Sequence, residues 1–187
     1  MITEFRTLEN MAGKEYDEAK TKVFYAEDYN AHSEAINNLE ENPVSVGCGC
    51  KVYSSDYQYI TTGVDTPLSF DLEEYDDDNF HDLVTNNDRI TIPEGKGGRY
   101  LVHAQAYFTF HASGYRRIYV KKNNSDKLCS KQIMAGGTSG SLTVDFSFIT
   151  NLEDDDFLSF FVYQNSGVSL GITPNKIYTS FSVQKLS

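Results

Sequence analysis

The spacing of apolar and ring-bearing residues changes near residue 43. Before that point these residues recur at alternating steps of four and three, a heptad pattern typical of a helix that packs along one side. Asn42-Pro43 ends the pattern, because a residue before proline disfavours the helical conformation. The pattern predicts a short helical segment within residues 1–43 and a separate domain over residues 44–187. The helix seam consists of Tyr25, Tyr29, His32, Ile36 and Leu39.

A single helix of this length is marginally stable in water, so the seam needs a partner. Two partners stay open at this point. The helix either packs against its own domain or associates with copies of itself.

From Val44 onward, apolar residues alternate with polar ones at a period of two, which is typical of half-buried strands. Turn residues separate these segments, and no helical stretch lies between them. The succession predicts an all-β fold, an antiparallel jelly-roll sandwich of about ten strands. The expected strands are 51–62, 67–70, 89–93, 99–110, 115–122, 128–134, 142–149, 157–163, 168–172 and 177–186.

The longest strand, 99–110, has an apolar face and an uncharged face. The apolar face is expected in the core and consists of Tyr100, Val102, Ala104, Ala106, Phe108 and Phe110. The other face holds Leu101, His103, Gln105, Tyr107 and Thr109. An exposed sheet face normally carries charged or polar side chains, so the absence of charge here predicts a covered surface.

Strand 157–163 is apolar on both faces, with Leu158, Phe160 and Val162 on one side and Phe157, Phe161 and Tyr163 on the other. A two-layer sandwich covers only one face, so the second face requires an extra layer or another subunit. Along strand 142–149, apolar and polar side chains alternate strictly, so one face of this strand is expected to be solvent-exposed. We therefore expect one doubly covered sheet that mediates self-association, which the resemblance described below implies is trimeric. Its predicted interface residues are Leu101, His103, Tyr107, Phe157, Phe161 and Tyr163.

Charge narrows the possible partners. The chain carries 27 acidic and 16 basic residues, a net charge of −11, which disfavours nucleic acids and anionic membranes. Its apolar runs are far shorter than the roughly 20 residues of a membrane span, and its first residues do not resemble a signal peptide. The odd count of three cysteines predicts free thiols in a reducing cytosol. A zinc site begun by Cys48 and Cys50 is the alternative.

The candidate chemistry is sparse. The acidic runs 73–78 and 153–156 are interpreted as solvated loop charge; if calcium bound there, its ligands would come from Asp76, Asp78, Asp154 and Asp156. The histidines lack metal-ligand spacing, and no serine motif has a strand-turn-helix context. We therefore expect no catalytic set, no enzyme activity and no cofactor.

A local group of basic residues stands out in this acidic chain, namely Arg116, Arg117, Lys121, Lys122, Lys127 and Lys131. It is interpreted either as a solvated hairpin or as a site for an anionic surface polymer such as a sugar acid. The predicted ligand-binding residues are Tyr115, Arg116 and Arg117.

Several segments resemble the globular-head domain of complement component one, q, and its tumour-necrosis-factor-like relatives. They are Phe70-Asp71, Tyr75-Asp76, Arg89-Ile90-Thr91-Ile92-Pro93, Gly98-Arg99-Tyr100-Leu101-Val102, Leu152 through Phe157, Gln164-Asn165-Ser166-Gly167 and Tyr178-Thr179-Ser180-Phe181-Ser182. The turn at 152–157 departs from the family pattern, because its glycine is replaced. The resemblance implies a ten-strand jelly roll, a compact homotrimer and a binding role.

The versions carried by tailed bacteriophages are the most similar, through Phe80-His81-Asp82, Asn86-Asn87-Asp88-Arg89, Gly114-Tyr115-Arg116 and the upstream residues 23–30. This similarity implies a virion-surface protein made in the host cytoplasm. Its N-terminal segment would contact other virion proteins, and its heads would bind a host glycan or receptor or decorate the capsid. The alternatives are a bacterial carbohydrate-binding lectin and a jelly-roll polysaccharide-degrading enzyme.

Overall fold

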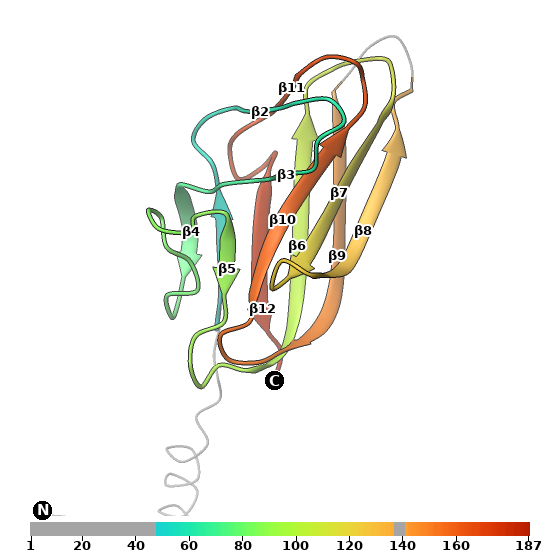
Figure 1. The fold of residues 1–187 in the computed structure, drawn as a ribbon. Helices are drawn as coiled ribbons and strands as arrows, with labels where there is room; N and C mark the ends of the chain where they lie inside the picture. The colour runs from blue at the N-terminus through green and yellow to red at the C-terminus, as the bar shows by residue number, and fades with distance from the viewer. Residues whose placement is uncertain (1–47, 137–140) are drawn as a thin grey trace, which may run out of the picture. The chain divides into compact units, whose positions relative to one another are not determined.

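The computed structural model describes residues 48–136 and 141–187, and these residues form two antiparallel β-sheets (Figure 1). The predicted helical segment and its seam lie outside the described residues. Within the described part of the chain there is no helix long and apolar enough to cross a membrane. The strands are β1 (Gly49–Tyr53), β2 (Gln58–Ile60), β3 (Thr66–Pro67), β4 (Leu72–Asp76), β5 (Arg89–Thr91), β6 (Gly98–Phe108), β7 (Tyr115–Lys122), β8 (Asp126–Met134), β9 (Leu142–Leu152), β10 (Phe157–Gln164), β11 (Leu170–Ile172) and β12 (Ser180–Lys185).

The two sheets pack face to face as the layers of a sandwich. The first sheet has the order β2-β11-β6-β12-β1-β4, and β9 pairs along the other side of β6. The second sheet has the order β3-β10-β7-β8, and β5 also pairs with β10. This arrangement confirms the predicted all-β antiparallel jelly roll.

The core follows from the alternation along β6. Its inward residues from Tyr100 to Phe108 are fully buried, as predicted. Phe160 of the second sheet contacts Phe181 of the first, with ring centroids 5.5 Å apart. Phe110 was wrongly assigned to this core: it lies beyond the end of β6 and is 45% exposed.

The acidic run 73–78 is not entirely a loop, because Leu72–Asp76 forms β4 at the edge of the first sheet. Charged side chains on an edge strand discourage pairing with other chains. The expected long strand 51–62 is instead divided into β1 and β2.

The turn before β10 has an aspartate where the resemblance implies a glycine. Asp155 has a φ of 65°, a left-handed conformation that favours glycine but that aspartate also adopts. The Asp156 carboxylate accepts a hydrogen bond from the Glu153 backbone N–H at 2.7 Å. The turn therefore keeps its shape without glycine.

Candidate functional site

The outer face of the first sheet contains half of the predicted trimer interface. Leu101 of β6 lies directly opposite Ile149 of β9 in the strand register. Leu101 is 38% exposed and Ile149 is 60% exposed. On the same face of β6 the side chains of His103, Gln105 and Tyr107 carry no formal charge, whereas Arg99, two residues before Leu101, is an exposed cation. Sequence analysis missed Ile149, although it is the one apolar residue in phase with the polar positions Thr143, Asp145 and Ser147.

His103 and Tyr107 extend this surface along β6. The His103 Nδ1 atom lies 2.9 Å from the Ser147 hydroxyl oxygen. Burial lowers the pKa of His103, which favours the neutral ring at pH 7. The Tyr107 ring packs at 5.1 Å from the ring of Tyr178, another exposed aromatic residue. The β6 side chains on this face are therefore uncharged from Leu101 to Tyr107, and the Tyr107 end of the face is rich in rings.

The other half of the predicted interface lies on the opposite side of the sandwich. Phe157, Phe161 and Tyr163 point outward from β10, which belongs to the second sheet. The expectation that all six residues share one doubly covered sheet is therefore wrong. Alternation shows how many faces of a strand are apolar, but it does not show which strands share a sheet.

Side chains of the same chain cover the outer face of β10. The Phe161 ring stacks on Tyr119 at 5.1 Å, and the Tyr163 ring stacks on Tyr115 at 5.4 Å. The Arg89 guanidinium lies 4.6 Å above the Phe157 ring. Side chains from β5 and β7 therefore leave these three rings half-buried within the single chain, and their place in a subunit interface stays a prediction.

Of the three predicted ligand-binding residues, Arg116 is misassigned. Its side chain is only 1% exposed, and its guanidinium donates hydrogen bonds to the carbonyl oxygens of His111, Ser113 and Tyr115. Arg117 is partly exposed and forms an ion pair with Asp65 at 2.7 Å. Neighbouring strand residues point to opposite faces, so Arg116 enters the core while Tyr115 and Arg117 remain outside.

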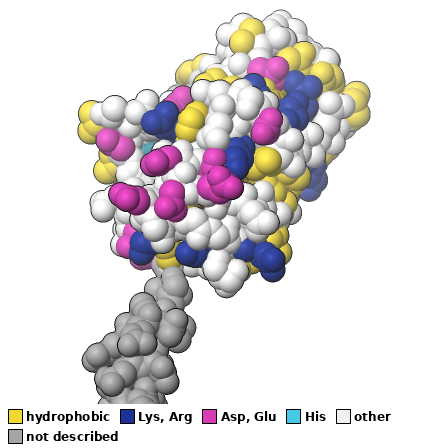
Figure 2. Space-filling model, turned by 60° about the horizontal axis from the view of Figure 1, so that its bottom comes forward, with side chains coloured by type: hydrophobic (Ala, Val, Ile, Leu, Met, Phe, Trp, Pro, Cys, Tyr) yellow, Lys and Arg dark blue, Asp and Glu magenta, His cyan; other side chains and the backbone are white. Residues whose placement is uncertain are grey.

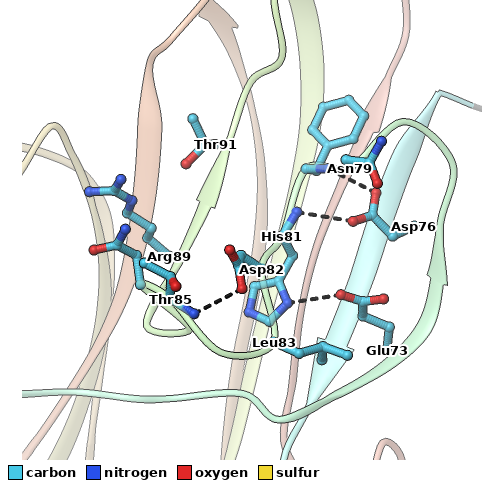
Figure 3. A pocket seen from close by; sticks show the side chains of 11 residues that line it. Glu73, Asp76, Asn79, His81, Asp82, Leu83, Thr85, Arg89 and Thr91 are labelled. Atoms are coloured by element: carbon cyan, nitrogen blue, oxygen red, sulfur yellow. Dashed lines mark hydrogen bonds and ion pairs between the residues drawn. The ribbon is translucent and has the colours of Figure 1, made fainter.

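A pocket of about 570 Å³ lies beside the loop that joins β4 to β5 (Figure 3). The Asp76 carboxylate organises this loop by accepting hydrogen bonds from the backbone N–H groups of Phe80 and His81. The His81 ring is buried between Glu73 Oε1, 3.1 Å from Nδ1, and the Asn87 carbonyl, 3.3 Å from Nε2. Residues 80–82 and 86–89 therefore build a self-bonded loop, in which both His81 nitrogens already have partners.

Each residue considered as a calcium ligand has a partner within the chain. Asp78 forms an ion pair with Lys96, and Asp154 accepts hydrogen bonds from the N–H groups of Gly95 and Gly97. These hydrogen bonds lower the pKa of both carboxyl groups. Among residues 48–136 and 141–187, no group of three or more histidine, cysteine, aspartate or glutamate residues is placed to hold a metal ion.

Asp156 is the most buried of these carboxylates. Burial raises its pKa, but hydrogen bonds from Lys122, the Glu153 N–H group and Asn123 outweigh burial and lower the pKa below its ordinary value. The side chain of Asn123 also accepts a hydrogen bond from the Phe157 N–H group. Asp156 therefore ties the β7–β8 turn to the start of β10.

We expect Asp156→Asn to lower the free energy of unfolding by about 1–3 kcal/mol at pH 7, because charge-assisted hydrogen bonds are lost. The folded-state pKa is lowered, so this stabilisation is present above pH 4 and declines as the pH falls through the folded-state pKa. Urea unfolding at pH 7 and about pH 3 should show the difference from wild type shrinking in acid. Exposed Asp155→Asn is the control, and a pH-independent difference for Asp156→Asn would contradict this role.

Comparison with known structures identifies the architecture. Eiger TNF from S. frugiperda aligns with a TM-score of 0.57 and 11% identity, over 75% of this chain and 93% of that chain. Murine APRIL at pH 5.0 aligns with a TM-score of 0.58 and 11% identity, over 75% and 99% of the two chains. The fold is a TNF-like jelly roll. No protein-family model and no curated protein sequence matches the chain.

The TNF-like jelly roll thus presents two outer faces of different chemistry. The first sheet offers the exposed apolar side chains of Leu101 and Ile149 around β6 and β9, with the charged side chains of Arg99 and Asp145 on the same face. The second sheet offers rings covered by cations around β10 and β7. The first type of surface suits association between subunits, whereas the second suits an anion.

Proposed function

We propose that this protein is a non-enzymatic virion structural protein of a tailed bacteriophage. It assembles as a homotrimer, and residues 1–43 attach it to other virion proteins. The jelly-roll heads are displayed on the particle, where they bind a host-surface component or decorate the capsid. The segments of the sequence that resemble phage proteins support the assignment to a phage virion. The TNF-like fold is compatible with trimeric assembly.

The uncharged stretch from Leu101 to Tyr107 on the outer face of β6 is the observation that supports assembly most. Although 23% of the chain is charged, the β6 side chains Leu101, His103, Gln105 and Tyr107 on this face carry no formal charge. The cores of subunit interfaces are depleted in charge and enriched in aromatic side chains. This face has that composition, together with the exposed pair Leu101 and Ile149.

The unpaired edge of β9 in the same sheet supports association of the subunits in a closed ring. Among the described strands, β9 pairs only with β6, which leaves its other edge open. Proteins usually cover or interrupt such an edge, because it can pair with other chains. A subunit packed around β9 would cover both the edge and Ile149, and cyclic symmetry repeats that contact three times in a trimer.

The loop pocket supports a role without catalysis. Both His81 nitrogens are engaged, and Asp76 and Asp82 accept hydrogen bonds from backbone N–H groups of their own loop. These side chains hold the loop in shape. A general base needs a free acceptor aimed at its substrate, and neither His81 nitrogen is free.

The proposal is tested on the full chain and on purified particles. Light scattering at micromolar concentration should give three times the 21.1 kDa of one chain. Antibody labelling of purified particles should locate the protein on their surface, and a chain lacking residues 1–43 should fail to attach. A monomer in solution, or absence from the particle, would contradict the proposal.

A further inference from the structure

Three cations form a row across the outer face of the second sheet. In the strand register, Arg89 of β5 lies opposite Ser159 of β10, and Ser159 lies opposite Lys121 of β7. Lys121 in turn lies opposite Lys127 of β8. Neighbouring strands are roughly 5 Å apart, so the row crosses four strands over roughly 15 Å.

Aromatic rings hold the heads of these cations in place. The Arg89 guanidinium lies 4.6 Å from the Phe157 ring centre. The Lys121 ammonium lies 4.6 Å from the centre of Phe161, and the Lys127 ammonium lies 4.2 Å from the centre of Tyr119. Cation–π contacts restrict long side chains and thereby reduce the ordering cost of binding.

The described residues form no close ion pair with this row. The nearby cations Arg117, Lys122 and Lys131 each have a carboxylate within 4.0 Å. Within the described ranges 48–136 and 141–187, no carboxylate lies that close to Arg89, Lys121 or Lys127.

Lys121 and Lys127 also face each other as a like-charged cross-strand pair, an arrangement that destabilises a sheet. They do so in a chain of net charge −11, where carboxylates are plentiful. Figure 2 shows Lys and Arg side chains next to hydrophobic ones, while many Asp and Glu side chains gather in another part of the visible face. Among the described residues the row therefore has no carboxylate in ion-pair contact, and it is suited to an external anion.

We infer that this row, called here the cation row, binds an acidic polysaccharide of the host surface, a linear polymer whose sugars carry carboxylates. The inference rests on the proposed function and names its ligand class. A row of cations matches repeated charges along a polymer better than it matches a single small anion. Guanidinium and ammonium groups form charge-assisted hydrogen bonds with carboxylates.

Nucleic acid fits the same surface less well. Proteins that bind single strands offer open aromatic faces for base stacking, whereas here cations and neighbouring rings occupy the faces. In a trimer assembled through the first sheet, the three cation rows remain exposed, and their combined binding raises avidity.

The test measures binding of the full-length trimer to immobilised polygalacturonate and polysialate at low and high salt. Neutral dextran and single-stranded oligothymidylate serve as comparison polymers. Wild type should bind both acidic polysaccharides, more weakly at high salt, and should not bind dextran. The double variant Lys121→Gln/Lys127→Gln should bind them at least about tenfold more weakly, through loss of two charged contacts.

The matched control is Lys96→Gln/Lys176→Gln, which removes the same charge from lysines paired with Asp78 and Glu74 elsewhere. It should bind within about twofold of wild type, and light scattering and thermal unfolding should show both variants folded and trimeric. Equal weakening in the control, equally tight oligothymidylate binding, or trimeric wild type that binds neither acidic polymer would overturn the inference. A monomeric wild type would instead overturn the proposed assembly.

Discussion

Leu101→Asp should convert the proposed trimer into a folded monomer. Leu101 is 38% exposed in the single chain, so aspartate at this position is tolerated when the subunit is alone. At a subunit interface the same carboxylate would be buried without a partner, at a cost of several kcal/mol in each of three contacts. Light scattering should give the mass of one chain, and circular dichroism should still show β-structure.

Val84→Asp is the matched control, because it makes a similar apolar-to-acidic change at a loop residue that is 88% exposed. This variant should remain trimeric. Ile149→Asp, opposite Leu101 on β9, should dissociate the trimer in the same way. If Leu101→Asp and Ile149→Asp both retain the mass of three chains, the first sheet does not form the interface.

Arg116→Ala should lower the free energy of unfolding by about 3–5 kcal/mol. The change removes a large buried side chain and leaves the carbonyl oxygens of His111, Ser113 and Tyr115 without their donor. Desolvation lowers the pKa of Arg116, consistent with a guanidinium held inside the protein. Denaturant unfolding at neutral pH measures the effect.

The neighbouring variant Arg117→Ala tests whether burial causes the loss of stability expected for Arg116→Ala. Arg117 has the same side chain, but its ion pair with Asp65 is at the surface, where such pairs contribute about 0–1 kcal/mol. Its stacking on Tyr163 adds a further contribution of about 0.5–1 kcal/mol. Similar losses for the two variants would show that the carbonyl contacts of Arg116 matter little.

The sequence alone determined the strand character and much of the core. Alternation along residues 100–108 predicted which β6 side chains are buried, because a pleated strand necessarily sends neighbours to opposite faces. The same alternation showed that the outward β6 side chains from Leu101 to Tyr107 carry no formal charge, although the exposed cation Arg99 lies in the same phase. The succession of strands predicted a jelly roll, and the resemblance of several segments implied that it is TNF-like; the comparisons confirm this fold.

Only the tertiary structure decided which faces belong together. β6 pairs with β9 and β12, whereas β10 pairs with β7, β5 and β3, so the two halves of the expected interface lie on opposite sides of the sandwich. Strand periodicity is a local property, but strand pairing joins residues far apart in the chain. No local pattern distinguishes a strand covered by another subunit from one covered by its own chain.

The cation row and Arg116 show that the sequence also leaves the surroundings of single side chains undetermined. Arg116 and Arg117 are adjacent basic residues in the sequence, yet one is enclosed by backbone carbonyls and the other forms a surface ion pair. Arg89 joins Lys121 and Lys127 only because β5 and β8 are brought into one sheet with β10 and β7. The sequence shows which residues are charged, whereas long-range packing decides which residues lie next to each charged side chain and how deeply it is buried.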